Sequence, residues 1–160
     1  MAPNSTSRTE QAMDYEITRT DAQWRELLDS TRYAILRQAA TERAFTGALL
    51  DENRRGVYAC GGCGAQLFTN ETKFDSHCGW PSFYDSIDPS AVELVEDRAH
   101  GMVRTEVRCA RCGSHLGHVF DDAPQTPTGD RFCMNSLSLT FEPAAGDVAG
   151  DADLATGDTA

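Results

Sequence analysis

CGGCG at residues 60–64 and CARCG at residues 109–113 are two copies of one short pattern, a CxxC pair followed by glycine. Glycine readily takes a positive φ, so each pair can sit on a tight turn whose backbone amides approach the sulfurs. Two such turns that face each other form a tetrahedral four-thiolate site, the usual arrangement for structural zinc. Redox-active dithiol pairs and surface thiols are the alternatives. The predicted ligands of one structural Zn²⁺ are Cys60, Cys63, Cys109 and Cys112.

Short segments that alternate apolar and polar residues surround these two pairs. They are GVYAC (56–60), AQLF (65–68), VELVED (92–97), MVRTEVRC (102–109) and LSLTFE (137–142). Alternation with period two, interrupted by glycine, aspartate and asparagine, is typical of half-buried strands joined by turns. The sequence therefore predicts a mainly β fold, a compact antiparallel domain of short strands, from residue 56 onward.

Two short helices are predicted on the N-terminal side of the β segments. Trp24, Leu27 and Leu28 have the i, i+3, i+4 spacing that places them on one face of a helix. A second helix follows, with Ile35 and Leu36 on its buried side. We expect both helices to pack against the β domain and to serve a structural purpose.

The composition limits the partners and the location of the protein. The chain of 160 residues has a net charge of −11, with a single lysine, Lys73, among 14 basic residues. Nucleic-acid binding is disfavoured, since it needs a positive surface. The sequence shows neither a secretory signal nor an apolar run of about 18 residues, so we expect a cytoplasmic protein without a membrane span. In that compartment, six cysteines indicate metal binding or redox catalysis rather than a disulfide framework.

The acidic residues and the chain ends indicate one domain with polar flanks. The acidic excess is spread along the chain, which favours solubility at high salt over an acidic tail that binds a partner. Residues 1–19 are polar, and residues 143–160 are mostly alanine, glycine and aspartate. Both segments are predicted to be disordered, since they have little apolar surface to bury. The predicted domain therefore spans residues 20–142.

Cys133 stands apart from the cysteine pairs, in GDRFCMNSLS at residues 129–138. On a strand, residues two apart share a face, so Arg131 and Asn135 would lie beside its sulfur. A thiol attacks only as the thiolate, and a neighbouring cation raises the thiolate fraction. The alternative is a buried, inert cysteine, but a guanidinium and an amide on the same face argue against it. We expect RFCMNSLSLTFE (131–142) to form one strand, on which Ser136, Ser138 and Thr140 face water.

Two further segments carry groups that could assist a reactive thiol. DSHCGWPSFYD (75–85) holds the sixth cysteine, Cys78, on a loop rich in aromatic residues. Trp80 and Phe83 could be core residues, or they could line a small apolar pocket beside the spare thiol. SHLGHVFDD (114–122) adds a carboxylate and two histidines, which can donate or accept a proton near neutral pH. These polar groups are His115, His118 and Asp122.

Taken together, the motifs resemble the B-type methionine sulfoxide reductases, the family that acts on the R epimer. The similarity runs from Trp24 to Glu142. The segments that carry it are TERAFTG (41–47), GVYACGGCG (56–64), TKFDSHCGWPSF (72–83), CARCGSHLGHVF (109–120) and PTGDRFCMNS (127–136). The resemblance implies a β-tent-like domain of two small antiparallel sheets, with short N-terminal helices and a Cys₄ zinc site. One departure is His77, where the family commonly has glycine.

The resemblance also implies a role for each motif residue. Cys133 matches the catalytic cysteine, which attacks the sulfoxide sulfur of an oxidised protein or peptide and becomes a sulfenic acid as methionine leaves. Cys78 matches the resolving cysteine, which forms a disulfide with it, and a thioredoxin-like dithiol protein then restores both thiols. Trp80, with Phe83 beside it, would contact the substrate. The remaining matched active-site positions are His115, His118, Asp122, Arg131 and Asn135.

Two other functions compete with the reductase. A zinc-stabilised β module that only binds a peptide or protein would not need both spare cysteines, nor the histidines and arginine around them. A general disulfide oxidoreductase that uses the CxxC pairs would be free of zinc. The presence of Cys133 together with Cys78 distinguishes the reductase from both.

Overall fold

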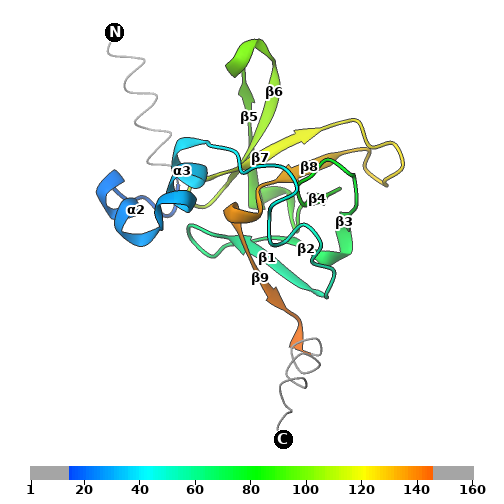
Figure 1. Ribbon diagram of the computed structural model, residues 1–160, viewed down its shortest axis with the longest axis horizontal. Helices are drawn as coiled ribbons and strands as arrows, with labels where there is room; N and C mark the ends of the chain where they lie inside the picture. The colour runs from blue at the N-terminus through cyan, green and yellow to red at the C-terminus, as the bar shows by residue number, and fades with distance from the viewer. Residues whose placement is uncertain (1–14, 146–160) are drawn as a thin grey trace, which may run out of the picture.

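The computed structural model describes residues 15–145 and shows a mainly β domain with two short helices at one side (Figure 1). The strands form two antiparallel sheets, as predicted. The three-stranded sheet has the order β2-β1-β9, with bounds Gln66–Thr69, Gly56–Cys60 and Leu139–Pro143. The six-stranded sheet has the order β3-β4-β8-β7-β6-β5. Its bounds in that order are Lys73–Phe74, Ser82–Phe83, Arg131–Met134, His115–Phe120, Arg104–Cys109 and Val92–Asp97.

The helices α2 (Asp21–Leu27) and α3 (Ser30–Gln38) lie where the sequence predicts them. The first begins at a capping box. The Gln23 amide donates to the Thr20 hydroxyl at 3.1 Å, and the Thr20 amide donates to the Gln23 side chain at 2.9 Å. Asp29 caps the second helix through its carboxylate, which accepts from the Arg32 amide at 2.8 Å. Both starts therefore follow from side chains that satisfy amides with no partner in the helix.

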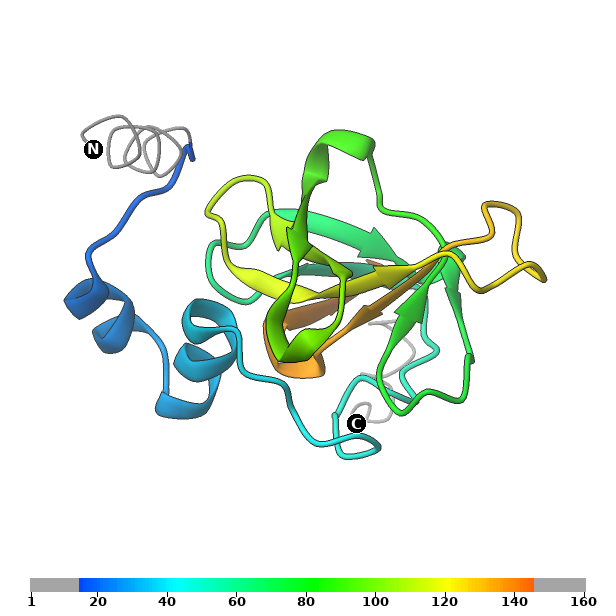
Figure 2. The same ribbon diagram turned by 90° about the horizontal axis from the view of Figure 1, so that it is seen from above.

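The buried faces of the helices agree with the predicted pattern except at one residue. Trp24 and Leu36 are 2% and 1% exposed, and α3 packs against β7 (Figure 2). Leu27, expected on the same face as Trp24, is instead 53% exposed. The helix α2 ends at Leu27, and Leu28 has an extended backbone that turns its side chain inward. Leu28 therefore takes the buried position beside Trp24, and Leu27 is left at the surface.

The core lies where the two sheets meet. Phe68 of the three-stranded sheet stacks on Phe83 of the six-stranded sheet, with ring centroids 4.4 Å apart. Tyr58 of β1 meets Phe83 edge-on at 5.0 Å, and all three side chains are 0% exposed. Each such pair contributes roughly 0.5–1.5 kcal/mol beyond the burial of its area, so the aromatic contacts fix one sheet against the other.

The strand predicted to run on from Cys133 is interrupted, and the predicted exposure of its serines is wrong. A 3₁₀ turn, η4 (Ser136–Ser138), separates β8 from β9. Ser136 and Ser138 are 3% and 0% exposed. The Ser138 hydroxyl donates to the backbone carbonyl of His115 at 3.0 Å, and Ser136 accepts from the Leu49 amide at 3.2 Å. The turn carries the chain from the six-stranded sheet to the three-stranded one, so strand alternation cannot persist through it.

The described part of the chain begins inside the N-terminal segment that is predicted to be disordered. Residues 1–14 and 146–160, most of the two segments predicted to be disordered, lie outside the described residues. The Ile17 amide donates to the Arg111 carbonyl at 3.0 Å, so the chain contacts the domain before residue 20. At the other end, β9 extends to Pro143. Within residues 15–145, no helix is long and apolar enough to cross a membrane.

Candidate active site and metal site

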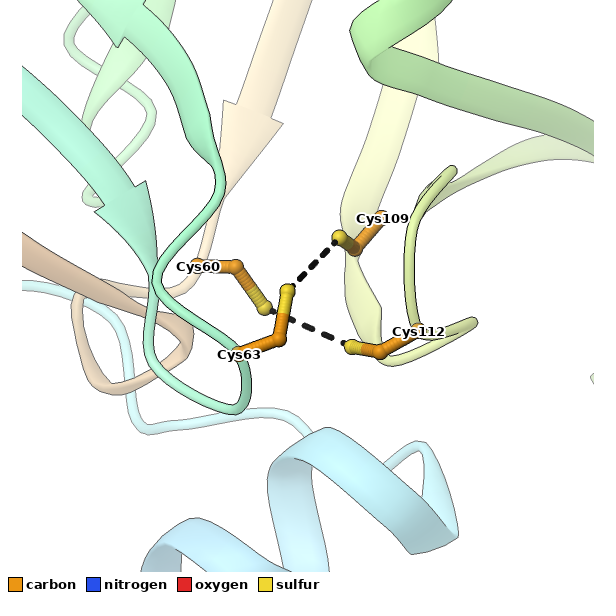
Figure 3. Close-up of side chains that lie close together, drawn as sticks. All are labelled: Cys60, Cys63, Cys109 and Cys112. Atoms are coloured by element: carbon orange, nitrogen blue, oxygen red, sulfur yellow. Dashed lines mark hydrogen bonds between the residues drawn. The ribbon is translucent and has the colours of Figure 1, made fainter. Parts of the chain in front are cut away.

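Two turns bring four cysteines together between the two sheets (Figure 3). Cys60 ends β1 and Cys63 lies on the turn after it, while Cys109 ends β6 and Cys112 lies on the turn after that strand. Their sulfurs lie within 4.8 Å of one another, with 3.7 Å between Cys60 and Cys112 and 3.6 Å between Cys63 and Cys109. Four sulfurs bound to zinc at about 2.3 Å would be about 3.8 Å apart. The cluster is therefore spaced to hold one metal ion in tetrahedral geometry.

The glycines after the CxxC pairs have the positive φ predicted for them. Gly64 has φ +83° and Gly113 has φ +77°. Each glycine amide donates at 2.8 Å to the carbonyl of the first cysteine of its pair, Cys60 or Cys109. The Gly62 amide also lies 3.3 Å from the Cys60 sulfur. These contacts hold each pair on a tight turn, with its sulfurs directed toward the other pair.

The two spare cysteines meet at the centre of the six-stranded sheet. On β8, Cys133 lies opposite Ser82 of β4 on one side and opposite His118 of β7 on the other. Its sulfur is 3.2 Å from the sulfur of Cys78, which lies on the loop before β4. The hydroxyls of Ser76 and Ser82 lie 3.0 and 3.4 Å from the Cys78 sulfur. A disulfide needs a sulfur separation of about 2.05 Å, so only a small movement would join the pair.

A hydrogen bond between the two thiols shifts their pKa values in opposite directions. The pKa of Cys78 is lowered to about 4, chiefly by the hydrogen bond to Cys133. The pKa of Cys133 is raised, first by its hydrogen bond to Cys78 and then by burial, while the charge of Arg131 acts in the opposite direction. The arginine thus has the predicted effect, but the partner cysteine outweighs it. At neutral pH the pair carries one thiolate and one proton, as two coupled groups do.

A pocket of about 280 Å³ contains this sulfur pair. Seven of the nine residues predicted to act in catalysis or substrate binding line this pocket. Those seven are Cys78, Trp80, His115, His118, Arg131, Cys133 and Asn135. Four lining residues had no predicted role: Thr41, Arg104, Gly117 and Phe120. Among them Gly117 is needed for close packing, because a Cβ there would lie 2.1 Å from the Cys133 carbonyl oxygen.

Arg131 is held beside the pocket by a carboxylate and an aromatic ring. Asp122 accepts two hydrogen bonds, from Nε and Nη2 of Arg131, both at 2.9 Å. The guanidinium also lies 4.5 Å from the centre of the Phe120 ring. The hydrogen bonds from Arg131 lower the pKa of Asp122, which keeps it ionised. Asp122 does not line the pocket, and it contacts the pocket only through Arg131 among the described residues.

Comparisons with known proteins agree with this arrangement. The SelR domain family model matches residues 28–143. A protein from Leifsonia xyli subsp. xyli is 63% identical over 130 residues, which cover 81% of this chain and 94% of the relative. One from Thiobacillus denitrificans is 54% identical over 131 residues, 82% of this chain and 98% of the relative. Both are named peptide methionine sulfoxide reductase MsrB. The chain belongs to the MsrB family. Among solved structures, the Mis18 "Yippee-like" domain covers 57% of the chain at a TM-score of 0.46 and 18% identity.

In this MsrB-family protein, the TERAFTG segment fixes the indole of the pocket. The Trp80 ring nitrogen donates to the backbone carbonyl of Glu42 at 3.0 Å. The Glu42 amide donates to the Asn135 side chain at 3.0 Å, and the Asn135 amide group donates to the Leu116 carbonyl at 3.1 Å. Asn135 therefore serves mainly as a bridge between β7 and the chain that holds Trp80. This bridge could not be predicted from the sequence, since it joins residues far apart along the chain.

Both histidines of this MsrB-family site are bonded to carboxylates that sequence reasoning missed. Nδ1 of His115 lies 2.7 Å from Glu106, and Nε2 of His118 lies 2.8 Å from Asp97. Arg104 also contacts Asp97, at 3.3 Å. Burial lowers the pKa of His118, and Asp97 only partly offsets that effect. Both carboxylates lie in segments predicted to be strands, where alternation indicates a face but not the neighbour across it.

Phe83 lies in the core and not in the MsrB-family pocket, which corrects its predicted contact with substrate. Its side chain is 0% exposed and stacks on Phe68. On β4 the preceding residue, Ser82, faces the Cys78 sulfur, and successive residues of a strand point to opposite sides. The sequence left open whether Trp80 and Phe83 are core residues or pocket residues. Phe83 is a core residue, and Trp80 lines the pocket.

Proposed function

We propose that this protein reduces methionine-R-sulfoxide in oxidised proteins to methionine, with Cys133 as nucleophile and Cys78 as resolving cysteine. The observation that carries the proposal is the pair of sulfurs 3.2 Å apart in a pocket lined by an arginine, two histidines and an indole. A module that only binds a peptide has no use for this pair. The four CxxC sulfurs cluster with one another instead, as a metal site requires.

The first chemical step uses the proton that the two thiols share. When that proton moves to Cys78, Cys133 becomes the thiolate, and the charge of Arg131 compensates it. The thiolate attacks the sulfoxide and takes its oxygen, while a pocket histidine supplies a proton to that oxygen. The methionine sulfur gains two electrons and leaves as a thioether, and Cys133, oxidised by two electrons, becomes a sulfenic acid.

The second step closes a disulfide between the two cysteines. The Cys78 sulfur attacks the sulfenic acid, the Cys133–Cys78 bond forms, and the oxygen leaves as water. Cys78 is partly exposed, so a thioredoxin-like dithiol protein can reach its sulfur and restore both thiols by exchange. Without such a reductant the protein would turn over once.

Selectivity for the R epimer requires more than apolar contact. The indole of Trp80 lines the pocket and can hold the S-methyl group of the substrate. Burial of one methyl contributes about 0.8 kcal/mol, which corresponds to a preference of only about fourfold, since 1.4 kcal/mol is tenfold. Strict selectivity must therefore come from the oxygen, which only one epimer presents to the proton donors while its methyl group meets the indole.

We further propose that the ion of the cysteine cluster is zinc and that its role is structural. Four cysteines fill a tetrahedral shell and leave no position open for substrate. Six free cysteines also fit a reducing compartment, so we propose a cytoplasmic location. The proposed catalytic unit is residues 20–142, flanked by residues 1–19 and 143–160.

The deciding experiment measures reduction of methionine sulfoxide in a blocked amino acid, with the R and S epimers tested separately and dithiothreitol as reductant. The wild type is compared with Cys133→Ser. We expect turnover of the R epimer only, and its loss in the variant. Absence of turnover with either epimer, in folded protein loaded with zinc and at both low and high salt, would count against the reductase and in favour of a binding module.

A further inference from the structure

His115 is buried with one ring nitrogen bonded and the other without a partner. The residue is 5% exposed, and its Nδ1 lies 2.7 Å from Oε2 of Glu106. Its Nε2 is buried and has no hydrogen-bond partner among residues 15–145. A buried polar atom without a partner is unfavourable. Because the ring lines the pocket that holds Cys133, the bound substrate is the group that can satisfy it.

Glu106 is well placed to control which nitrogen of His115 carries a proton. It lies on β6, is 8% exposed and does not line the pocket. Its second oxygen, Oε1, accepts from Arg108 at 3.0 Å. Burial by itself would raise the pKa of Glu106, but the hydrogen bonds from His115 and Arg108 outweigh burial and lower it. The carboxylate is therefore ionised and can only accept, so Nδ1 of His115 must be the donor.

We infer that Glu106 is a positioning residue for the reduction: it holds the proton of His115 on Nδ1 and turns Nε2 toward the substrate oxygen. The inference rests on the proposed function. In the first step the protonated ring gives its Nε2 proton to the oxygen that moves to Cys133. His115 is left neutral, with the Nδ1 proton still bonded to Glu106.

His118 is less suited to that transfer. Its Nε2 is already bonded to Asp97 at 2.8 Å, and Asp97 is also held by Arg104 at 3.3 Å. The His118 ring lies 5.6 Å from the His115 ring, so the two histidines share the pocket but have different bonding. Of the two pocket histidines, only His115 has a buried ring nitrogen without a hydrogen-bond partner among the described residues. Glu106 therefore acts through His115 and not through His118.

The test is a double-mutant cycle on the rate of methionine formation in a single turnover. A proton donor contributes about 10²–10⁴-fold to such a rate. We expect Glu106→Gln to lower this rate by at least about tenfold, and by no more than the full contribution of a proton donor. The KM for the blocked amino acid should change little. In a His115→Asn background, Glu106→Gln should have no further effect. In a His118→Asn background it should retain its full effect.

The matched control is Glu96→Gln, the same carboxylate-to-amide change on β5 of the same hairpin. Glu96 is exposed and pairs with Arg98, so its loss should leave the rate unchanged. Equal losses from Glu106→Gln in the wild-type and His115→Asn backgrounds would overturn the inference, as would an unchanged rate. Lack of any turnover by the wild type would instead overturn the proposed function.

Nitrogen NMR of His115 gives a readout that does not depend on activity or on a stable variant. In the reduced wild-type protein, the neutral ring should carry its proton on Nδ1. In Glu106→Gln the ring should become a mixture of both tautomers, whereas in Glu96→Gln it should not change. A wild-type ring with its proton on Nε2 would overturn the inference, even if Glu106→Gln failed to fold.

Discussion

At the scale of single residues, the site works through pairs of groups that set each other's state. Cys78 and Cys133 share one proton across 3.2 Å. Arg131, which is fixed by Asp122, favours the thiolate of Cys133 and opposes the raising effect of Cys78. In the proposed mechanism, Cys133 is therefore not permanently ionised. It would become a thiolate by exchange of a proton with Cys78, the proposed resolving cysteine.

Replacement of Cys78 by serine should separate the two chemical steps. Cys78→Ser keeps Cys133, Arg131 and the pocket, so one equivalent of methionine should still form per chain. The sulfenic acid then has no thiol to attack it, and turnover with thioredoxin should stop. Quenched single-turnover assays and steady-state assays measure the two steps. Thioredoxin-driven turnover at the wild-type rate in this variant would contradict the resolving role.

The shared proton also predicts an unusual pH dependence of alkylation. Because the pKa of Cys78 is lowered to about 4, its thiolate should persist between pH 5 and 9, and the rate of alkylation by iodoacetamide should be nearly constant there. Cys133→Ser removes the thiol–thiol hydrogen bond that is the main cause of the lowered pKa of Cys78. The pKa of Cys78 should then rise toward that of an ordinary thiol, about 8.5, and the rate should fall steeply below about pH 8. Mass spectrometry of the alkylated Cys78 peptide measures both profiles. A wild-type profile that falls below pH 8 would contradict the shared proton.

At the scale of elements, irregular turns and loops between the strands position the side chains of the site. The turn η4 ends β8 directly after the Cys133 segment and moves the chain into the other sheet. On the loop before β4, His77 has φ 63° and Gly79 has φ 97°. These left-handed residues flank Cys78 and aim its sulfur at Cys133. The φ of His77 also accounts for the glycine that the family commonly has there.

The end of α3 offers a test of such a junction away from the site. Ala39 caps the helix with φ 58° and ψ 33°, a left-handed conformation that costs an alanine roughly 1–2 kcal/mol. Glycine removes this strain but adds about 0.4–1 kcal/mol of unfolded-state entropy. Ala39→Gly should therefore stabilise the fold slightly, by about 0.5 kcal/mol, or about 2 °C in Tm. The control is Ala40→Gly, where φ is not positive and the change should destabilise the protein. A lower Tm for Ala39→Gly would contradict the strain.

Features of these elements could be predicted from the sequence where they depend on residues that are neighbours along the chain. The spacing of the cysteine pairs, the positive φ of Gly64 and the common face of Arg131 and Cys133 depend on neighbours along the chain, and all could be predicted. Glu106 could not, because the register between β6 and β7 shifts between Val107 and Arg108. That irregularity brings Glu106 to His115 although its direct partner is His118.

At the scale of the whole molecule, the metal site joins two sheets that otherwise meet through the aromatic core. One cysteine pair lies at the end of β1 of the three-stranded sheet, and the other lies at the end of β6 of the six-stranded sheet (Figure 3). The active site lies entirely on the six-stranded sheet and its loops, apart from the Thr41–Glu42 segment that supports Trp80. In our proposal, a metal held there would contribute to activity only indirectly, because it would fix the sheet that carries Cys133.

Removal of the metal should unfold the domain rather than merely inactivate it. Structural zinc binds with about 10–16 kcal/mol of apparent free energy, which equals or exceeds the roughly 5–15 kcal/mol of net stability that a small domain has. We expect about one zinc per chain, and after chelation the loss of a cooperative thermal transition measured by circular dichroism. The control is the Cys78→Ser, Cys133→Ser double variant, which keeps only the cluster cysteines and should lose its transition in the same way. A chelated protein with the original Tm would show that the aromatic contacts of Phe68, Phe83 and Tyr58 are sufficient to hold the sheets, and the cysteine cluster would then have no structural role.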